Sequence, residues 1–222
     1  MRENIIPSTI TLTPTARMHS QGVRFAVIDD FLPGKQFSAA ADAFDDLRLN
    51  PVLSSIDPIY DGPAYLGDGG KSSLRGSESG TPPWQRILKE QVCVCLGIWA
   101  ATSADALCMT LSGRGYPAES RLGWHNDGAD NRVGAYVYFA HRNWSASWGG
   151  GLTLIDEEAP QRVDGIDLLD SATHPVSIFP RPNRLVIFRS HTMHAVQRVD
   201  PTAGDRLRKT WTGFVVKDPN GH

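Results

Sequence analysis

The sequence predicts a mainly β fold with flanking α-helices, and two patterns predict it. After residue 104, short runs rich in β-branched and aromatic residues are separated by Gly, Pro and Asp. Before it, two segments carry apolar residues at three- and four-residue spacing, which is typical of helices. With 222 residues, 41% of them hydrophobic, the chain can build one substantial core. We expect a single domain over residues 1–222, with a helical part at about 1–104 and a β core at about 105–216.

One strand and two helices are expected in the N-terminal part. Residues 23–31 alternate enough to form a strand, and Pro33 then opens a helix. A second helix should begin after Pro82 and Pro83. Its inward stripe comprises Trp84, Ile87, Leu88, Gln91, Cys95, Ile98 and Trp99. Both stripes are typical of buried helix faces, so we expect the helices to support one sheet.

A long loop is expected over residues 57–83, because this stretch repeats glycine, serine and proline. Loops beyond about 12 to 15 residues without regular structure are usually functional covers or linkers. Two interpretations stay open, a substrate lid and a solvated loop without substrate contact. As a lid, the loop would offer Tyr60, Tyr65, Lys71 and Arg75 for recognition.

The strands expected in the β core are each bounded by turn residues. They cover residues 106–111, 134–140, 152–155, 176–179, 184–188 and 209–216. Taken alone, this pattern is typical of a β sandwich or barrel.

Composition argues against several classes of protein. The formal net charge of −2 gives no polyanion-binding surface, so nucleic acid is not expected as a partner. No apolar run approaches the roughly 20 residues of a membrane helix, and residues 1–21 lack the features of a signal peptide. Cys93, Cys95 and Cys108 are too few and odd in number for a disulfide framework. We therefore expect a cytoplasmic protein with buried thiols and no membrane partner.

Two histidines and one aspartate form the most informative pattern. In an extended strand His125 and Asp127 would share a face, with Asn126 pointing away. Two imidazoles and one carboxylate are the facial triad that holds non-haem Fe(II) and leaves coordination positions open. The distal histidine is either His191 or His194, since both follow the strand expected at 184–188.

Further segments accompany this pattern in a fixed order. They are residues 116–127, 132–139, 143–144, 148–152, 183–188, 194–196 and 208–214, with a weaker match over 23–32. Together they resemble the prolyl-hydroxylase-like branch of the Fe(II)/2-oxoglutarate-dependent oxygenases, over about residues 105–216. The resemblance implies a double-stranded β-helix, or jelly roll, with iron near its open end.

The resemblance also implies the metal ligands. They would be His125, Asp127 and His194, because His194 matches the family's ligand position and lies 14 residues before Arg208 (208 − 194 = 14). His191 would then be a polar rim residue. The remaining histidines, His19, His141, His174 and His222, have no motif around them and are interpreted as surface or structural.

For the co-substrate, the resemblance assigns the distal carboxylate of 2-oxoglutarate to Arg208 and Thr210. Two residues apart on a strand, they share a face, and a guanidinium with a hydroxyl suits a carboxylate. Arg206 is the competing arginine on the same strand face. Tyr116 matches a tyrosine that commonly hydrogen-bonds the co-substrate, and its alternative is a core aromatic residue.

One departure from the family concerns a second tyrosine for the distal carboxylate. Where the animal oxygen-sensing prolyl hydroxylases carry it, this chain has Phe139, with Tyr136 and Tyr138 in the opposite register. The carboxylate pocket would be completed by Thr210, or differently by Tyr136 or Tyr138. Arg132 also matches a family position, where it would steady the loop or reach toward substrate. Trp144 and the turn at residues 148–151 are interpreted as structural.

The function implied is that of an Fe(II)- and 2-oxoglutarate-dependent dioxygenase, a hydroxylase of an unactivated C–H bond in a small-molecule or amino-acid-derived substrate. O2 would be the oxidant, and ascorbate comes into consideration as an accessory reductant. An intact Asp127 disfavours halogenation, for which related enzymes carry a small residue there. One alternative is a prolyl or peptidyl hydroxylase acting on a protein. The second is a non-oxygenase metal-binding jelly roll, which would give Arg208 and Thr210 no purpose.

Overall fold

The computed structural model describes residues 13–68, 72–74, 80–157, 162–163, 166–167 and 175–218. Its helices are α1 (Gly34–Asp45) and α2 (Pro83–Ala100), with short 3-10 turns η1 (Ala104–Ala106), η2 (Ala146–Trp148) and η3 (Pro201–Ala203). Its strands are β1 (Arg17–Gln21), β2 (Phe25–Asp29), β3 (Leu49–Val52), β4 (Ala64–Gly67), β5 (Ser72–Leu74), β6 (Leu107–Tyr116), β7 (Leu122–His125), β8 (Arg132–Phe139), β9 (Leu152–Ile155), β10 (Arg162–Val163), β11 (Ile166–Asp167), β12 (Pro175–Ile178), β13 (Leu185–Arg189), β14 (His194–Val196) and β15 (Arg208–Lys217).

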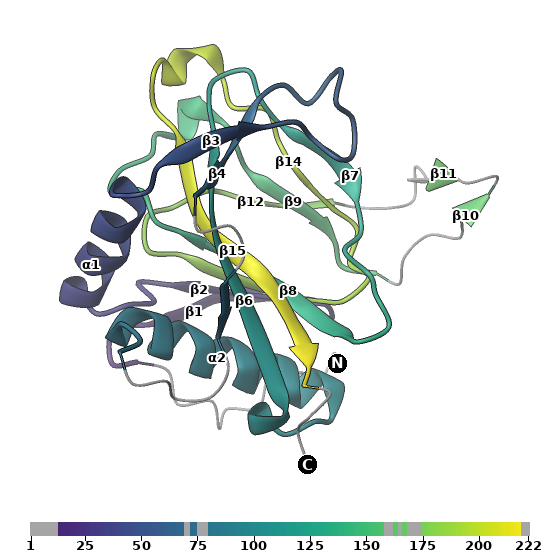
Figure 1. Cartoon of the computed structure of the whole chain (residues 1–222). Helices are drawn as coiled ribbons and strands as arrows, with labels where there is room; N and C mark the ends of the chain where they lie inside the picture. Colours follow the sequence, from purple (N-terminus) through teal and green to yellow (C-terminus); the bar gives the residue numbers. More distant parts are fainter. Residues whose placement is uncertain are drawn as a thin grey trace.

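Two antiparallel sheets face each other as the layers of a jelly roll (Figure 1). The major sheet has the order β1-β2-β13-β8-β15-β6-β4-β3, and β5 also pairs with β6. The minor sheet has the order β12-β9-β14-β7. The mainly β architecture expected from the sequence is therefore confirmed. Its strand at residues 152–155 coincides with β9, and those at 176–179 and 184–188 differ from β12 and β13 by one residue at each end.

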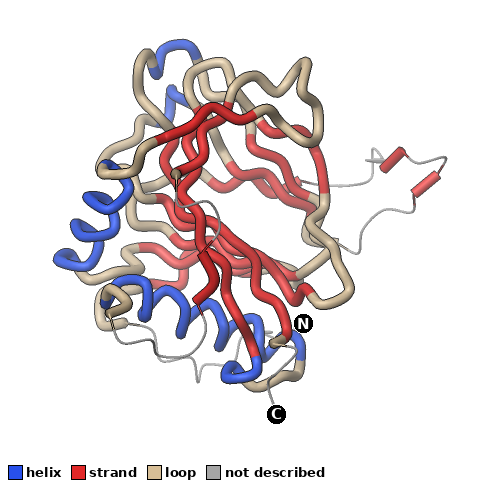
Figure 2. The backbone as a smooth tube through the Cα atoms, in the orientation of Figure 1, coloured by secondary structure: helices blue, strands red, loops and turns tan. Residues whose placement is uncertain are grey.

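Both helices lie on the outer side of the major sheet, away from the minor sheet (Figure 2). Alternation along β8 sends Tyr136 and Tyr138 into the core between sheet and helices. Ala135, Val137 and Phe139 point the other way, into the core between the two sheets. The side chains of β8 thus contribute to both hydrophobic cores, one on each face of the major sheet.

Both helices begin where the prolines predict. Pro33 caps α1 and Pro82 caps α2, whose first residue, Pro83, lacks the N–H that would be unpaired there. The residue that follows α2, Ala101, adopts the left-handed conformation and caps the end of the helix. Its predicted inward stripe is correct except at Ile98, which is one of the exposed large hydrophobic residues.

The expected long loop over 57–83 is wrong in part, since β4 and β5 lie within it. The helical N-terminal part is likewise interrupted by strands. The strand β4 pairs with β6 at Tyr65↔Gly115 and Leu66↔Arg114. This is possible because β6 continues to Tyr116, five residues beyond the predicted end at 111 (116 − 111 = 5). Lys71 and Arg75, two of the expected lid residues, lie outside the described residues.

Glycines hid this continuation of β6. A Cβ atom on Gly113 would lie 2.4 Å from Cδ1 of Leu47 and 3.3 Å from Cε2 of Phe44. Glycine at this position lets both side chains pack directly against the strand, whereas a larger residue would displace them. The residue that weakens the strand pattern in the sequence is therefore the one that permits this close packing.

Candidate active site

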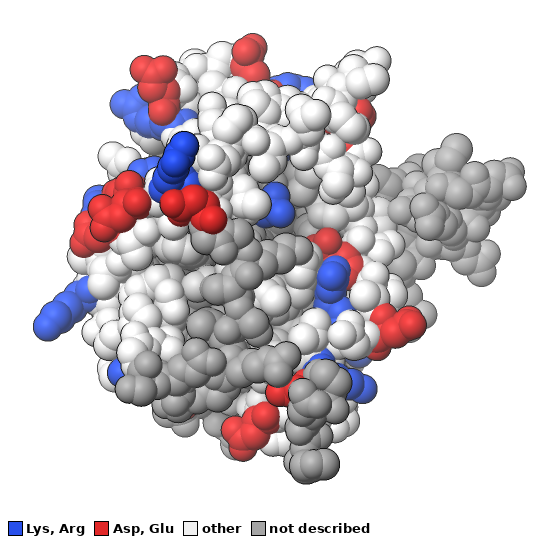
Figure 3. Space-filling model, in the orientation of Figure 1, with Lys and Arg blue, Asp and Glu red and all other residues white. Residues whose placement is uncertain are grey.

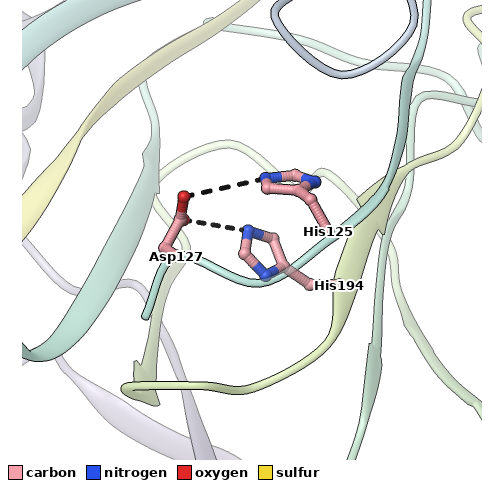
Figure 4. A group of neighbouring side chains, drawn as sticks. All are labelled: His125, Asp127 and His194. Carbon is pink, nitrogen blue, oxygen red and sulfur yellow. Dashed lines mark ion pairs between the residues drawn. The ribbon is translucent and has the colours of Figure 1, made fainter. Parts of the chain in front are cut away.

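Three potential metal ligands meet between the ends of two neighbouring strands of the minor sheet (Figure 4). His125 ends β7 and His194 begins β14, and the two are paired in register. Asp127 follows two residues after β7, so the expectation that it shares a strand face with His125 is wrong. The loop nevertheless turns its carboxylate toward the imidazoles, and one ligand atom from each residue lies within 4.8 Å of the others.

Backbone carbonyls fix the orientation of both imidazoles. Nδ1 of His125 lies 2.8 Å from the oxygen of Gly123, and Nδ1 of His194 lies 2.9 Å from that of Thr192. A carbonyl only accepts, so each Nδ1 carries a proton, and Nε2 is the nitrogen of each imidazole that can bind a metal. The Nε2 atoms lie 3.9 Å (His125) and 3.2 Å (His194) from the carboxylate oxygens of Asp127.

The protonation states also suit a cation. Burial, with the neighbouring His194, lowers the pKa of His125 to about 4. Burial alone would raise the pKa of Asp127, but His194, His125 and Arg132 lower it below the ordinary aspartate value. At neutral pH His125 is therefore neutral and Asp127 is ionised. These are the forms in which the two side chains bind a metal.

Arg132 holds the loop that carries Asp127. Its Nη1 donates to the backbone oxygen of Asp127 and lies 3.9 Å from the carboxylate, and its guanidinium stacks 3.6 Å from the ring centre of Phe214. This geometry agrees with the loop-steadying alternative. His191 is exposed, with φ 59°, and its ring packs against Gly128 rather than joining the cluster.

Arg208 is a buried cation at the start of β15. It is 1% exposed, its Nε donates to the oxygen of Gly150 at 2.5 Å, and its Nη2 has no hydrogen-bond partner. Burial lowers the pKa of Arg208 to about 10, so the group remains charged at neutral pH. A buried charge without a counter-ion is unfavourable, which makes this position ready to receive an anion.

The glycine-rich turn after Trp148 makes room for this arginine. Gly150 has φ +70°, and a Cβ there would lie 3.0 Å from Cδ of Arg208. Phe139 and Tyr116 face the guanidinium, whose Cζ lies 4.9 Å and 5.5 Å from their ring centres. Trp144 closes the turn by donating its Nε1 hydrogen to the oxygen of Gly149.

Thr210 and Tyr116 lie beside Arg208 on the same face of the major sheet. Tyr116 is directly opposite Arg208 in the register of β6 and β15, and both it and Thr210 are buried. The hydroxyl of Thr210 donates to the oxygen of Arg114. Burial raises the pKa of Tyr116, and the positive charges of Arg114 and Arg208 partly offset this, so the phenol keeps its proton.

Other candidates from the sequence lie elsewhere. Arg206 precedes β15 and is exposed, with its guanidinium 4.5 Å from the ring centre of Trp148. The hydroxyls of Tyr136 and Tyr138 donate to Thr110 and Asn183 in the helix-side core, so neither completes a carboxylate pocket.

Among the remaining candidates, Tyr60 is largely exposed. Tyr65 points away from the cavity between the two sheets, whose wall instead contains its neighbours Ala64 and Leu66.

A cavity of about 480 Å³ connects the three-residue cluster with Arg208. Its wall includes His125, Asp127, His194, Tyr116, Arg208 and Thr210. Apolar side chains from both sheets complete the wall; among them are Val137, Leu152, Phe188, Val196 and Phe214. Figure 3 shows a small blue group of lysine or arginine atoms near the middle of the view, recessed behind the white atoms beside it.

Sequence reasoning missed two residues of this site, Arg114 and Asp61. Arg114 lines the cavity from β6 and was missed because β6 was expected to end at residue 111. Asp61 is fully buried, and its carboxylate accepts hydrogen bonds from Ser54 and from the backbone of Gly123. It thereby fastens the segment after β3 to the strand that carries His125, whose partner is the carbonyl of the same Gly123.

Comparison with protein families matches residues 111–216 to the 2OG-Fe(II) oxygenase superfamily. No curated protein sequence matches the chain. Among solved structures, a Pseudomonas putida prolyl-4-hydroxylase aligns with TM-score 0.57 and 18% identity, over 87% of this chain and 92% of that one. A Trichoplax adhaerens prolyl hydroxylase, in complex with a hypoxia inducible factor peptide fragment, gives 0.57 and 16%, over 87% and 83%.

A third similar structure has a different reaction. The α-ketoglutarate-dependent epimerase SnoN from nogalamycin biosynthesis aligns with TM-score 0.59 and 10% identity, over 87% of this chain and 78% of that one. At such identities these likenesses establish the fold, whereas the family match covers the cluster and the buried arginine. The match of residues 111–216 to the 2OG-Fe(II) oxygenase superfamily, together with the cluster of His125, Asp127 and His194, supports a 2-oxoglutarate-dependent dioxygenase that uses Fe(II), 2-oxoglutarate and O2.

Proposed function

We propose that this dioxygenase hydroxylates an unactivated C–H bond of a small molecule. In this proposal His125, Asp127 and His194 hold Fe(II), and Arg208 binds the distal carboxylate of 2-oxoglutarate. The observation that carries the proposal is that one cavity contains both a three-ligand cluster and a buried guanidinium with an unpaired nitrogen. The family match over residues 111–216 also argues against the non-oxygenase alternative.

Bound Fe(II) supplies the coupling of 2-oxoglutarate decarboxylation by O2 to oxidation of the substrate. The chain's own residues bind and orient. Arg208 offers a charge-assisted hydrogen bond from Nη2 and remains a cation at neutral pH. Thr210 and Tyr116 add hydroxyl groups beside it, and the apolar wall of the cavity limits the access of water.

The size of the cavity favours a small-molecule substrate over a protein. Its volume of about 480 Å³ lies in the ordinary range of small-molecule sites, about 300 to 1,000 Å³, and 2-oxoglutarate must share it. The alternative, a prolyl or peptidyl hydroxylase, is tested by release of succinate with a panel of small acids, amino acids and proline-containing peptides. Stimulation by peptides alone would replace the proposed substrate class.

The metal ligands are tested with a matched pair of histidines. His194→Ala should abolish succinate formation and lower the bound Fe(II), because three protein ligands become two. His191→Ala should retain both, since His191 is exposed and outside the cluster. Loss of iron and activity in His191→Ala, with neither lost in His194→Ala, would refute the assignment.

A further inference from the structure

We infer that the substrate carries a carboxylate attached to an apolar body, and that Arg114 binds this carboxylate. The inference rests on the proposed function and goes beyond it by naming a substrate chemistry and a residue that recognises it. Three observations carry it: the position of Arg114, the charge balance of the cavity, and the apolar rim.

Arg114 is placed to contact a molecule in the cavity. It lies on β6 two residues before Tyr116, opposite Thr210 in the register with β15, and its side chain is half-buried in the cavity wall. Its positive charge acts on the phenol of Tyr116, where it opposes the rise in pKa that burial causes. Among the described residues, no carboxylate lies within 4.0 Å of its guanidinium. A cation held this way in a concave site is available to an anionic ligand.

The charges of the cavity show which cations are already matched. Its described wall contains four arginines, Arg114, Arg121, Arg132 and Arg208, but only one carboxylate, Asp127. Arg121 pairs with Asp61 at 3.3 Å, outside the wall, and Arg132 is bonded to the loop of Asp127.

With Fe(II) and 2-oxoglutarate present, the two charges of the metal are balanced by Asp127 and one carboxylate of the co-substrate. The other carboxylate balances Arg208. Arg114 then remains as a cation without a counter-ion. An anionic substrate would supply a counter-ion for Arg114, whereas a cationic group near Arg114 would be repelled.

The same inventory argues against a free ammonium group on the substrate. The wall offers no described carboxylate other than Asp127, which the metal requires. A carboxylic acid or an N-acylated amino acid therefore fits better than a free amino acid, whose ammonium group would be desolvated without a partner.

The rim of the cavity supplies a contact for an apolar body. Leu53 and Ile56 line the cavity although they are 78% and 41% exposed. Asp61 holds their segment in place, because it accepts hydrogen bonds from Ser54 and from Gly123 on β7. The apolar side chains are thus fixed toward the opening, and a ligand that covers them would bury area that now faces water.

The test compares acids with their uncharged amides. Purified enzyme with Fe(II) and 2-oxoglutarate, kept anaerobic, is titrated by calorimetry with 4-methylpentanoate, 4-methylpentanamide, N-acetyl-L-leucine, L-leucine and L-leucinamide. A parallel series with phenyl in place of the isopropyl group covers larger bodies. We expect the carboxylate and N-acetyl compounds to bind about 10- to 100-fold more tightly than the amides, the range typical of a hydrogen bond to a charged group.

Variants assign this preference to a residue. Arg114→Gln should reduce the affinity for the acids to that for the amides, and Arg114→Lys should restore part of it. Neither should change the affinity for 2-oxoglutarate more than about 3-fold, roughly 0.7 kcal/mol. Arg206→Gln is the matched control, because Arg206 is exposed and outside the cavity, and it should change neither affinity.

Three results would overturn the inference while leaving the proposed function intact. One is that no acid binds more tightly than its amide, or none binds at all, although Fe(II) and 2-oxoglutarate bind. Another is that free L-leucine binds as tightly as its N-acetyl derivative. The last is that Arg114→Gln weakens 2-oxoglutarate as much as the acids, which would place Arg114 in the co-substrate site. If wild-type enzyme fails to bind 2-oxoglutarate with Fe(II), the proposed function itself fails.

Discussion

Arg184, which directly precedes β13, and Arg208, which begins β15, are both buried arginines, yet their surroundings differ in kind. Arg184 makes two hydrogen bonds to the carboxylate of Asp29, at 2.6 and 3.0 Å, and another to the oxygen of Phe179. Arg208 is more deeply buried, has no described carboxylate beside it, and keeps Nη2 unpaired. The first arginine is satisfied by the chain itself, whereas the second needs a molecule that the chain does not contain.

The same contrast separates the two faces of the sheet. On the helix side, the buried hydroxyl of Tyr136 donates to Thr110, and the indole of Trp211 donates to the oxygen of Ala40. On the cavity side, Arg114 and Arg208 lack counter-ions among the described residues. Folding alone favours full pairing of buried polar groups, so unpaired groups gathered in one cavity mark the surface kept for ligands.

Breaking the satisfied pair should have the largest effect on stability. Arg184→Ala leaves Asp29 as a buried carboxylate that has lost its main partner, so the free energy of unfolding should fall by about 3–5 kcal/mol. Denaturant titration followed by circular dichroism measures this change. Affinity for 2-oxoglutarate, measured below the melting temperature, should be unchanged; a parallel loss would mean that the two arginines do not have separate roles.

Removing Arg208, unlike removing Arg184, should not lower the stability of the ligand-free protein. Arg208→Met replaces an unpaired buried charge by an apolar group, so the ligand-free variant should be at least as stable as wild type. Ligand at 100 times the wild-type dissociation constant should stabilise the wild type by about 2.7 kcal/mol and the variant by less than about 1 kcal/mol. Thermal unfolding with Fe(II), with and without 2-oxoglutarate, measures both. A less stable ligand-free variant would assign Arg208 a structural role.

A smaller effect is expected in the pH dependence of the unfolding free energy, to which Asp29 contributes at acidic pH. Burial alone would raise the pKa of Asp29, but Arg184, Arg181 and His19 lower it below the ordinary aspartate value. The folded state therefore binds its proton less readily than the unfolded state. The resulting stability is complete above about pH 5, where the unfolded state is also ionised, and is lost as the pH falls through the lower, folded pKa.

Asp29→Asn removes this titration. The difference in unfolding free energy between wild type and Asp29→Asn should be constant above about pH 5 and shrink below about pH 4. Denaturant titrations at a series of pH values measure it. A difference that grows as the pH falls would contradict the direction assigned to the pKa of Asp29.

The sequence predicted the parts of the fold and site that local patterns encode. The helix starts at Pro33 and Pro82 and the strand β9 are visible as fixed residue types or continuous apolar runs. His125 and His194 could be paired because motifs around both occur in a known order. These signals do not depend on what packs against each segment.

The parts that the sequence missed depend on contacts between distant segments. The strand β6 contains Gly113 because Leu47 and Phe44 pack against it, and the resulting break in the pattern hid Arg114. The role of Asp61 arises only when its segment meets Gly123 on β7. For the continuation of β6, the available signal was a glycine inside an otherwise regular strand. Continuing the alternation back from Tyr116 would have found Arg114.

The central claim, that Arg208 is the cation reserved for 2-oxoglutarate, is tested most directly by anaerobic titration of Fe(II)-loaded enzyme with 2-oxoglutarate, following the charge-transfer absorption. Losing one partner of a buried charge pair costs about 2–5 kcal/mol, so Arg208→Ala should weaken binding about 30-fold to a few thousandfold while Fe(II) still binds. Arg206→Ala, which removes an exposed arginine, should change the affinity far less. A large loss in Arg206→Ala with none in Arg208→Ala would contradict the claim.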